Sequence, residues 1–145
     1  MQEAPRPIGR SVWAIFAGFL VVVVLSIATD LLMHVVGVMP PIGQPVTDKP
    51  LLVATIYRSI YAILGSYITA RLAPYQPMLH ALWGGVIGLV LGVIGAVTTW
   101  NRGPEFGPHW YPIALIVVAL PCAWVGGKIA ERQMSARSTN SVLTR

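Results

Sequence analysis

Residues 78–101 read MLHALWGGVIGLVLGVIGAVTTWN, an apolar stretch of more than twenty residues that contains five glycines. Three of them, Gly84, Gly88 and Gly92, recur at every fourth position and therefore share one face of a helix. In water, each glycine in a helix costs ~1 kcal/mol relative to alanine. In a lipid bilayer the backbone has no water to bond with, so helix is the stable state of a single spanning segment. The stretch therefore predicts a transmembrane helix whose glycine row offers a flat groove to a neighbouring helix.

The composition of the whole chain points to the same environment. Of the 145 residues, 55% are hydrophobic and 10% are charged, whereas a soluble globular domain carries roughly 25% charged residues. So few charges cannot cover a water-facing surface, and we expect the outside of the protein to face lipid. The single cysteine, Cys122, lies in an apolar run, which excludes an intramolecular disulfide and a cysteine metal cluster.

Four apolar runs predict an all-α integral membrane protein with four transmembrane helices in an antiparallel bundle. Each run is long enough to cross a hydrocarbon core of about 30 Å. The helices are expected at about 11–36, 51–73, 78–100 and 110–130. Together they form one transmembrane domain over 11–131, between an N-terminal tail at 1–10 and a flexible tail at 132–145. A cleaved signal peptide is the alternative for the first run, but signal cores span only about 7–15 residues.

Two local features refine this arrangement. The connection at 74–77 is so short that the second and third helices are expected to form a tight hairpin. Pro121 lies inside the fourth run and removes one helical hydrogen bond, so a kink is expected there.

The basic residues predict the orientation of the bundle. Seven of the ten lysines and arginines fall on the side that carries both termini, and only Lys49 and Arg102 fall opposite. The positive-inside rule therefore places both termini in the cytoplasm, and the five tryptophans lie near the ends of the runs, as interfacial anchors do. The net charge of +5 is thus explained by topology, and we expect no nucleic-acid partner. A multi-pass protein of the bacterial cytoplasmic (inner) membrane is the predicted location.

Two charged residues, Asp30 and Arg58, lie well inside apolar runs. An isolated charge at the centre of a helix costs about 2.5–3.5 kcal/mol on insertion scales. Counted from the predicted helix ends at 1.5 Å per residue, Asp30 is ~9 Å deep and Arg58 is ~10 Å deep. We therefore predict an ion pair in the outer half of the bundle, with Tyr61 able to hydrogen-bond it and His34 one turn outward of Asp30.

This cluster has two interpretations. Charges inside a membrane protein usually mark a functional site, and then Asp30, His34, Arg58 and Tyr61 line a path for a substrate or ion. The alternative is that the ion pair only fixes the register of the first two helices. Independently of this choice, we expect the glycines of the third helix to be its packing surface, namely Gly84, Gly88, Gly92 and Gly95.

Three functions remain open at this level. The first is an oligomeric transport or permeation protein, and the second is a non-catalytic accessory or structural subunit of a larger membrane complex. The third is a haem- or quinone-binding redox component, for which His34, Glu105, His109 and Asp30 are the candidate ligands. No catalytic motif with diagnostic spacing is present, so we expect no enzyme, no resident metal and no cofactor. The expected partners are the lipid bilayer and either further copies of the chain or a larger membrane protein.

Overall fold

The computed structural model describes residues 8–143, of which residues 139–143 are described by their helical backbone alone. Four long helices follow one another, α1 Ile8–Val35, α2 Asp48–Leu72, α3 Pro77–Thr99 and α4 Trp110–Leu143, with a short 3₁₀ helix, η1 Pro104–Phe106, before α4. All four long helices are long and apolar enough to cross a membrane. The described part of the chain has no strand. These findings confirm the prediction of an all-helical protein with four candidate membrane spans.

The helix ends follow from local sequence. α2 begins at Asp48, one turn before its apolar run, because an acidic residue in the first turn interacts favourably with the positive helix terminus. α1 is closed by Gly37, whose φ of 77° is open to glycine at little cost. The amide of Gly37 donates to His34 O and that of Val38 to Met33 O, which is the hydrogen-bond pattern of a Schellman cap.

The predicted flexible tail at 132–145 is wrong for residues 132–143, which continue α4 as helix. Residues 144–145, and residues 1–7 of the predicted N-terminal tail, lie outside the described part of the chain. Adding residues to an existing helix is far cheaper than starting a new one, so the polar segment extends α4. Tyr67 on α2 also holds the first turn of this extension by donating a hydrogen bond of 2.7 Å to Gln133 Oε1.

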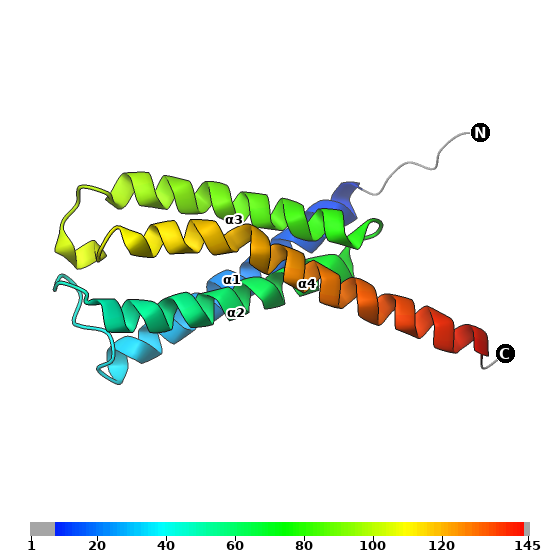
Figure 1. The fold of residues 1–145 in the computed structure, drawn as a ribbon, viewed down its shortest axis with the longest axis horizontal. Helices are drawn as coiled ribbons and strands as arrows, with labels where there is room; N and C mark the ends of the chain where they lie inside the picture. Colours follow the sequence, from blue (N-terminus) through cyan, green and yellow to red (C-terminus); the bar gives the residue numbers. More distant parts are fainter. Residues whose placement is uncertain (1–7, 144–145) are drawn as a thin grey trace.

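The helices form a bundle in which α2 packs on α1 and α4, and α3 packs on α4 (Figure 1). α4 changes direction in its middle, and Pro121 lies inside the helix, in line with the expected kink (Figure 1). The two long loops meet at one end of the bundle, where Val46 N donates to Pro104 O over 3.2 Å. At the start of α4, Trp110 Nε1 donates to Asp48 Oδ1 over 2.7 Å and ties α4 to the start of α2.

Small residues fill the interior and large apolar residues cover the outside. The buried apolar residues are mostly alanines, while many leucines, isoleucines, valines and tryptophans are exposed. This distribution suits a bundle surrounded by lipid, because small side chains let helix backbones approach closely. The buried alanines are Ala14, Ala54, Ala70, Ala81, Ala96, Ala123 and Ala130.

The closest helix contacts occur at glycines outside the predicted row. Gly18 on α1 meets the backbone of Gly65 on α2, and Gly126 on α4 lies against the α2 backbone at Ile63 and Tyr67. A Cβ at Gly85 on α3 would collide with the side chain of Ala123 on α4. These glycines and their partners set the distances between the helices.

The predicted row on α3 has a different environment. A Cβ on Gly88 or on Gly95 would meet nothing within 4 Å, and one on Gly84 would reach only Thr69 Oγ1, at 4.0 Å. Gly92 has the closest neighbour, with Ile116 Cγ1 at 3.2 Å from its Cβ position. Within one copy of the chain, therefore, most of this row borders open space.

Candidate functional site

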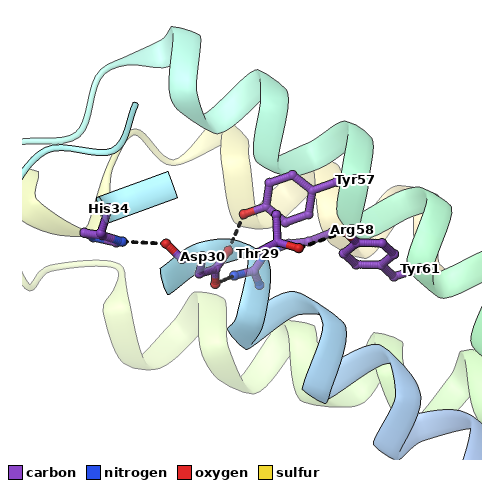
Figure 2. Close-up of polar contacts among 6 residues, drawn as sticks. All are labelled: Thr29, Asp30, His34, Tyr57, Arg58 and Tyr61. Atoms are coloured by element: carbon purple, nitrogen blue, oxygen red, sulfur yellow. Dashed lines mark hydrogen bonds and ion pairs between the residues drawn. The ribbon is translucent and has the colours of Figure 1, made fainter. Parts of the chain in front are cut away.

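The structure contains the predicted ion pair between α1 and α2. Arg58 Nη2 donates to Asp30 Oδ2, and the side chains of Asp30 and Arg58 remain 28% and 33% exposed (Figure 2). Each charge offsets part of the cost of placing the other among apolar helices. The pair is accessible from outside the bundle because neither side chain is fully enclosed.

Tyr57 completes the pair, although the sequence pattern did not single it out. Its side-chain hydroxyl donates to Asp30 Oδ1, so each carboxylate oxygen of Asp30 has its own donor (Figure 2). Tyr57 is 8% exposed, the most enclosed member of the cluster. Tyr57 directly precedes Arg58 in the sequence, and this was the signal that could have identified it. The polar residues of α2 recur at steps of three and four, and that pattern favoured Tyr61 instead.

Tyr61 and His34 lie beside the ion pair without contacting its charged atoms. The hydroxyl of Tyr61 shares a hydrogen bond of 2.8 Å with Thr29 Oγ1, and the Tyr57 and Tyr61 rings are 5.7 Å apart. His34 Nδ1 lies 2.8 Å from the backbone oxygen of Asp30 (Figure 2). The structure thus brings Asp30, His34, Arg58 and Tyr61 into one neighbourhood, while the carboxylate is bound by Arg58 and Tyr57.

The two charges meet although they lie at different distances from their helix ends. Asp30 is five residues before the end of α1, about 8 Å, and Arg58 is ten residues after the start of α2, about 15 Å. The equal depths expected from sequence depended on α2 beginning at Leu51. Because α1 and α2 cross (Figure 1), residue counts along each helix do not give equal heights in the bundle.

A cavity of about 320 Å³ adjoins Arg58 on the side of α3 and α4; we call it the outer cavity. α3 contributes one wall through Gly92, Gly95, Ala96 and Thr99. The rest of the lining comes from Arg58, Phe106, Tyr111, Pro112 and Leu115. Two of the glycines predicted as packing residues therefore border a space beside the ion pair.

Hydrogen bonding of the Arg58 guanidinium is incomplete. Arg58 Nε is buried and has no hydrogen-bond partner among the described residues. Tyr111 lies close enough to Arg58 for the two to interact electrostatically. A buried unpaired donor costs about 1–3 kcal/mol, and the burial of Nε means that a ligand in the cavity would have to approach Arg58 through its other nitrogens.

A second groove, of about 110 Å³, lies along the same face of α3; we call it the inner groove. Gly84 and Gly88 line it from α3, and Gly18 and Gly65 line it from α1 and α2. Its surface is almost entirely apolar. The predicted glycine row therefore divides between the inner groove and the outer cavity.

The histidines and acids proposed as metal or haem ligands do not assemble. His109 stacks on Trp100 with ring centroids 4.1 Å apart, and its Nε2 lies 2.8 Å from Trp100 O. Among the described residues, no group of three or more His, Cys, Asp or Glu side chains is placed to hold a metal ion. His80 is buried at the opposite end of the bundle and packs edge-on against Tyr75 at 5.0 Å.

This site offers hydrogen-bond donors beside an ion pair that carries no net charge. Arg58 and Tyr111 provide donors on the outer cavity, and Asp30 is already occupied by Arg58 and Tyr57.

Comparison with known protein families, curated proteins and solved structures finds no match to this chain.

Proposed function

We propose that this chain is a small multi-pass protein of the bacterial cytoplasmic membrane that binds a small solute at the Asp30–Arg58 cluster and passes it across as a homo-oligomer. The four spans run antiparallel, with both termini in the cytoplasm. The arginine and lysine distribution supports this orientation, because seven of the ten basic residues belong to the terminal side.

The observation that carries the proposal is a partly exposed ion pair beside a cavity, inside an otherwise apolar bundle. Asp30 and Arg58 remain 28% and 33% exposed, and the outer cavity of about 320 Å³ adjoins Arg58. An ion pair that served only to lock two helices would be expected to be enclosed by them. Tyr57 holds the carboxylate in place, while Tyr61 bonds Thr29 and His34 bonds the backbone of Asp30 beside it.

A homo-oligomer fits the narrow interior of one copy. The buried core is made of alanines and other small residues, and it leaves little room for a path between the helices. The inner groove around Gly84 and Gly88 offers a second copy an apolar surface on which a helix backbone can pack closely. The state of assembly can be measured from the mass of the protein in detergent or nanodiscs.

A liposome flux assay tests the transport function. Wild type and Asp30→Asn are reconstituted at equal density, and fluxes of H⁺, Na⁺, K⁺, Cl⁻ and glycerol are compared. Asp30→Asn keeps the shape of the side chain but leaves Arg58 without a counter-charge, so at least one flux should change. Glu131→Gln is the matched control, because Glu131 pairs with Lys128 far from the cluster. Equal fluxes from all three proteins, for every solute, would remove the support for transport.

An accessory role in a larger membrane complex is the second candidate, and the inner groove favours it as well. Gly88 borders open space, so a helix of a different protein can occupy the position that a second copy would take. Co-purification of one other membrane protein in fixed ratio, lost in Gly88→Leu, would favour this role over the homo-oligomer.

A further inference from the structure

The outer cavity presents hydrogen-bond donors and no acid. Arg58 and Tyr111 are the two strongest donors in its lining, and the lining contains no Asp or Glu. No hydrogen bond is found for the Tyr111 hydroxyl within the described residues. The hydroxyl of Thr99, also in the lining, already donates to Gly95 O over 2.8 Å. A molecule in this cavity is therefore best held through an acceptor atom.

The charge balance decides what kind of acceptor fits. Asp30 already neutralises Arg58, so an anion in the cavity would leave the cluster with a net negative charge among apolar helices. Such an uncompensated charge is costly at this depth. A neutral carbonyl oxygen accepts the same hydrogen bonds without changing the net charge, and it is therefore the favoured partner.

The walls define the rest of the ligand. Phe106, Pro112 and Leu115 give an apolar surface, and Gly95 leaves the space next to the α3 backbone open. The volume of about 320 Å³ lies at the lower end of the range for small-molecule sites. This is room for one ring or a short chain segment with its head group.

We propose that the outer cavity binds an uncharged, largely apolar molecule through a carbonyl oxygen that accepts hydrogen bonds from Tyr111 and Arg58. Two membrane sources share this chemistry, the carbonyl of a quinone ring and the ester carbonyl of a lipid. The inference goes beyond the proposed function, because it names a ligand for the cavity beside the ion pair and does not depend on transport.

The test measures binding of decylubiquinone to the full chain in nanodiscs by infrared spectroscopy and by titration. Hydrogen bonding should lower the carbonyl stretching frequency of the bound quinone. Tyr111→Phe keeps the ring but removes the donor, so affinity should fall about three- to tenfold and part of the frequency shift should disappear. Tyr67→Phe is the matched control, because the same change is made where Tyr67 bonds Gln133, away from the outer cavity.

A steric variant gives a second readout. Gly95→Leu places a branched side chain at the wall of the outer cavity, where the added Cβ itself would meet nothing within 4 Å. It should abolish saturable quinone binding while leaving the helical content unchanged. Gly95→Ala should reduce binding only slightly. If Gly95→Leu and Tyr111→Phe both bind as wild type does, the proposal is overturned.

Three further comparisons identify the ligand and separate the two proposals. If lipid esters are the natural occupant, quinone binding should be weaker in ester-lipid nanodiscs than in nanodiscs of ether lipids, which lack the carbonyl. If decanoate binds more tightly than decylubiquinone, the charge argument fails and the inference with it. Saturable quinone binding that depends on Tyr111, with no flux that depends on Asp30, would support this inference and reject transport. Flux that depends on Asp30, without such binding, would do the reverse.

Discussion

Replacing the ion pair by leucines tests the arrangement of the cluster most directly. The structure makes the two single variants unequal. Asp30→Leu removes the acceptor of both the Arg58 guanidinium and the Tyr57 hydroxyl. Arg58→Leu leaves Asp30 with the hydrogen bond from Tyr57. The first change should therefore be the more damaging one.

The expected losses follow from the exposure of the pair. Breaking a fully buried pair costs about 3–5 kcal/mol, and an exposed pair is worth at most about 1 kcal/mol. With side chains 28% and 33% exposed, Arg58→Leu should cost about 2 kcal/mol of unfolding free energy. Asp30→Leu should cost about 3 kcal/mol, because the Tyr57 hydroxyl also loses its acceptor.

The double variant should be milder than either single one. With both charges gone, only the Tyr57 hydroxyl is left without its partner, which costs about 1 kcal/mol. Independent sites would instead show the sum of the two single losses, about 5 kcal/mol. The assay is reversible unfolding by sodium dodecyl sulfate in mixed micelles, followed by helical circular dichroism and tryptophan fluorescence.

The pair Lys128–Glu131 is the internal control. Its charged atoms are 3.4 Å apart on successive turns of α4, with side chains 43% and 34% exposed. The same leucine cycle there should give a coupling of no more than about 0.5 kcal/mol. Additive losses at Asp30 and Arg58 would refute the ion-pair reasoning, and a larger loss from Arg58→Leu than from Asp30→Leu would refute the role given to Tyr57.

Two further predictions concern helix packing and the loop end of the bundle. Gly126→Ala should cost about 1–3 kcal/mol of unfolding free energy, because the added Cβ would lie 2.8 Å from Tyr67 N. Gly9→Ala is the control and should not destabilise the protein, because a Cβ there meets nothing within 4 Å. Equal effects of the two changes would show that α2 and α4 are not in close backbone contact. Trp110→Phe removes the hydrogen bond to Asp48, so the Val46 amide should exchange its hydrogen about fivefold faster. Trp124→Phe, at an exposed tryptophan, should leave that rate unchanged. An exchange rate unaffected by Trp110→Phe would show that the bond between Trp110 and Asp48 does not hold the neighbouring Val46–Pro104 contact in place.

Much of the fold could be predicted because the bilayer acts on each segment separately. The expected starts and ends of α1, α2 and α3 lie within three residues of those observed. The fourth helix started where expected, at Trp110, but it continued to Leu143. Hydropathy marks where a helix leaves the apolar layer, and it does not mark where the helix stops. The extension beyond Ala130 therefore needed the helix propensity and contacts of polar residues such as Gln133.

The candidate site was predictable in its charges and less so in its neighbours. Asp30 and Arg58 are the charged residues well inside the apolar runs, and each needs an oppositely charged partner there. Tyr57 and Tyr61 are both one turn or less from Arg58, and either could serve from spacing alone. The way α1 packs against α2 decides that Tyr57 reaches Asp30 and Tyr61 reaches Thr29.

The sequence by itself determined that the chain has four lipid-compatible helices and that two of them carry opposite charges needing each other. Both properties depend on the free energy of placing a residue in an apolar layer. This free energy applies to each segment separately, whatever its neighbours are. The tertiary structure decided which glycines touch a neighbouring backbone, at Gly18, Gly65, Gly85 and Gly126, and which border open space, at Gly88 and Gly95. That choice depends on the rotation of each helix about its axis and on its crossing angles, which are set by all the contacts of the bundle together.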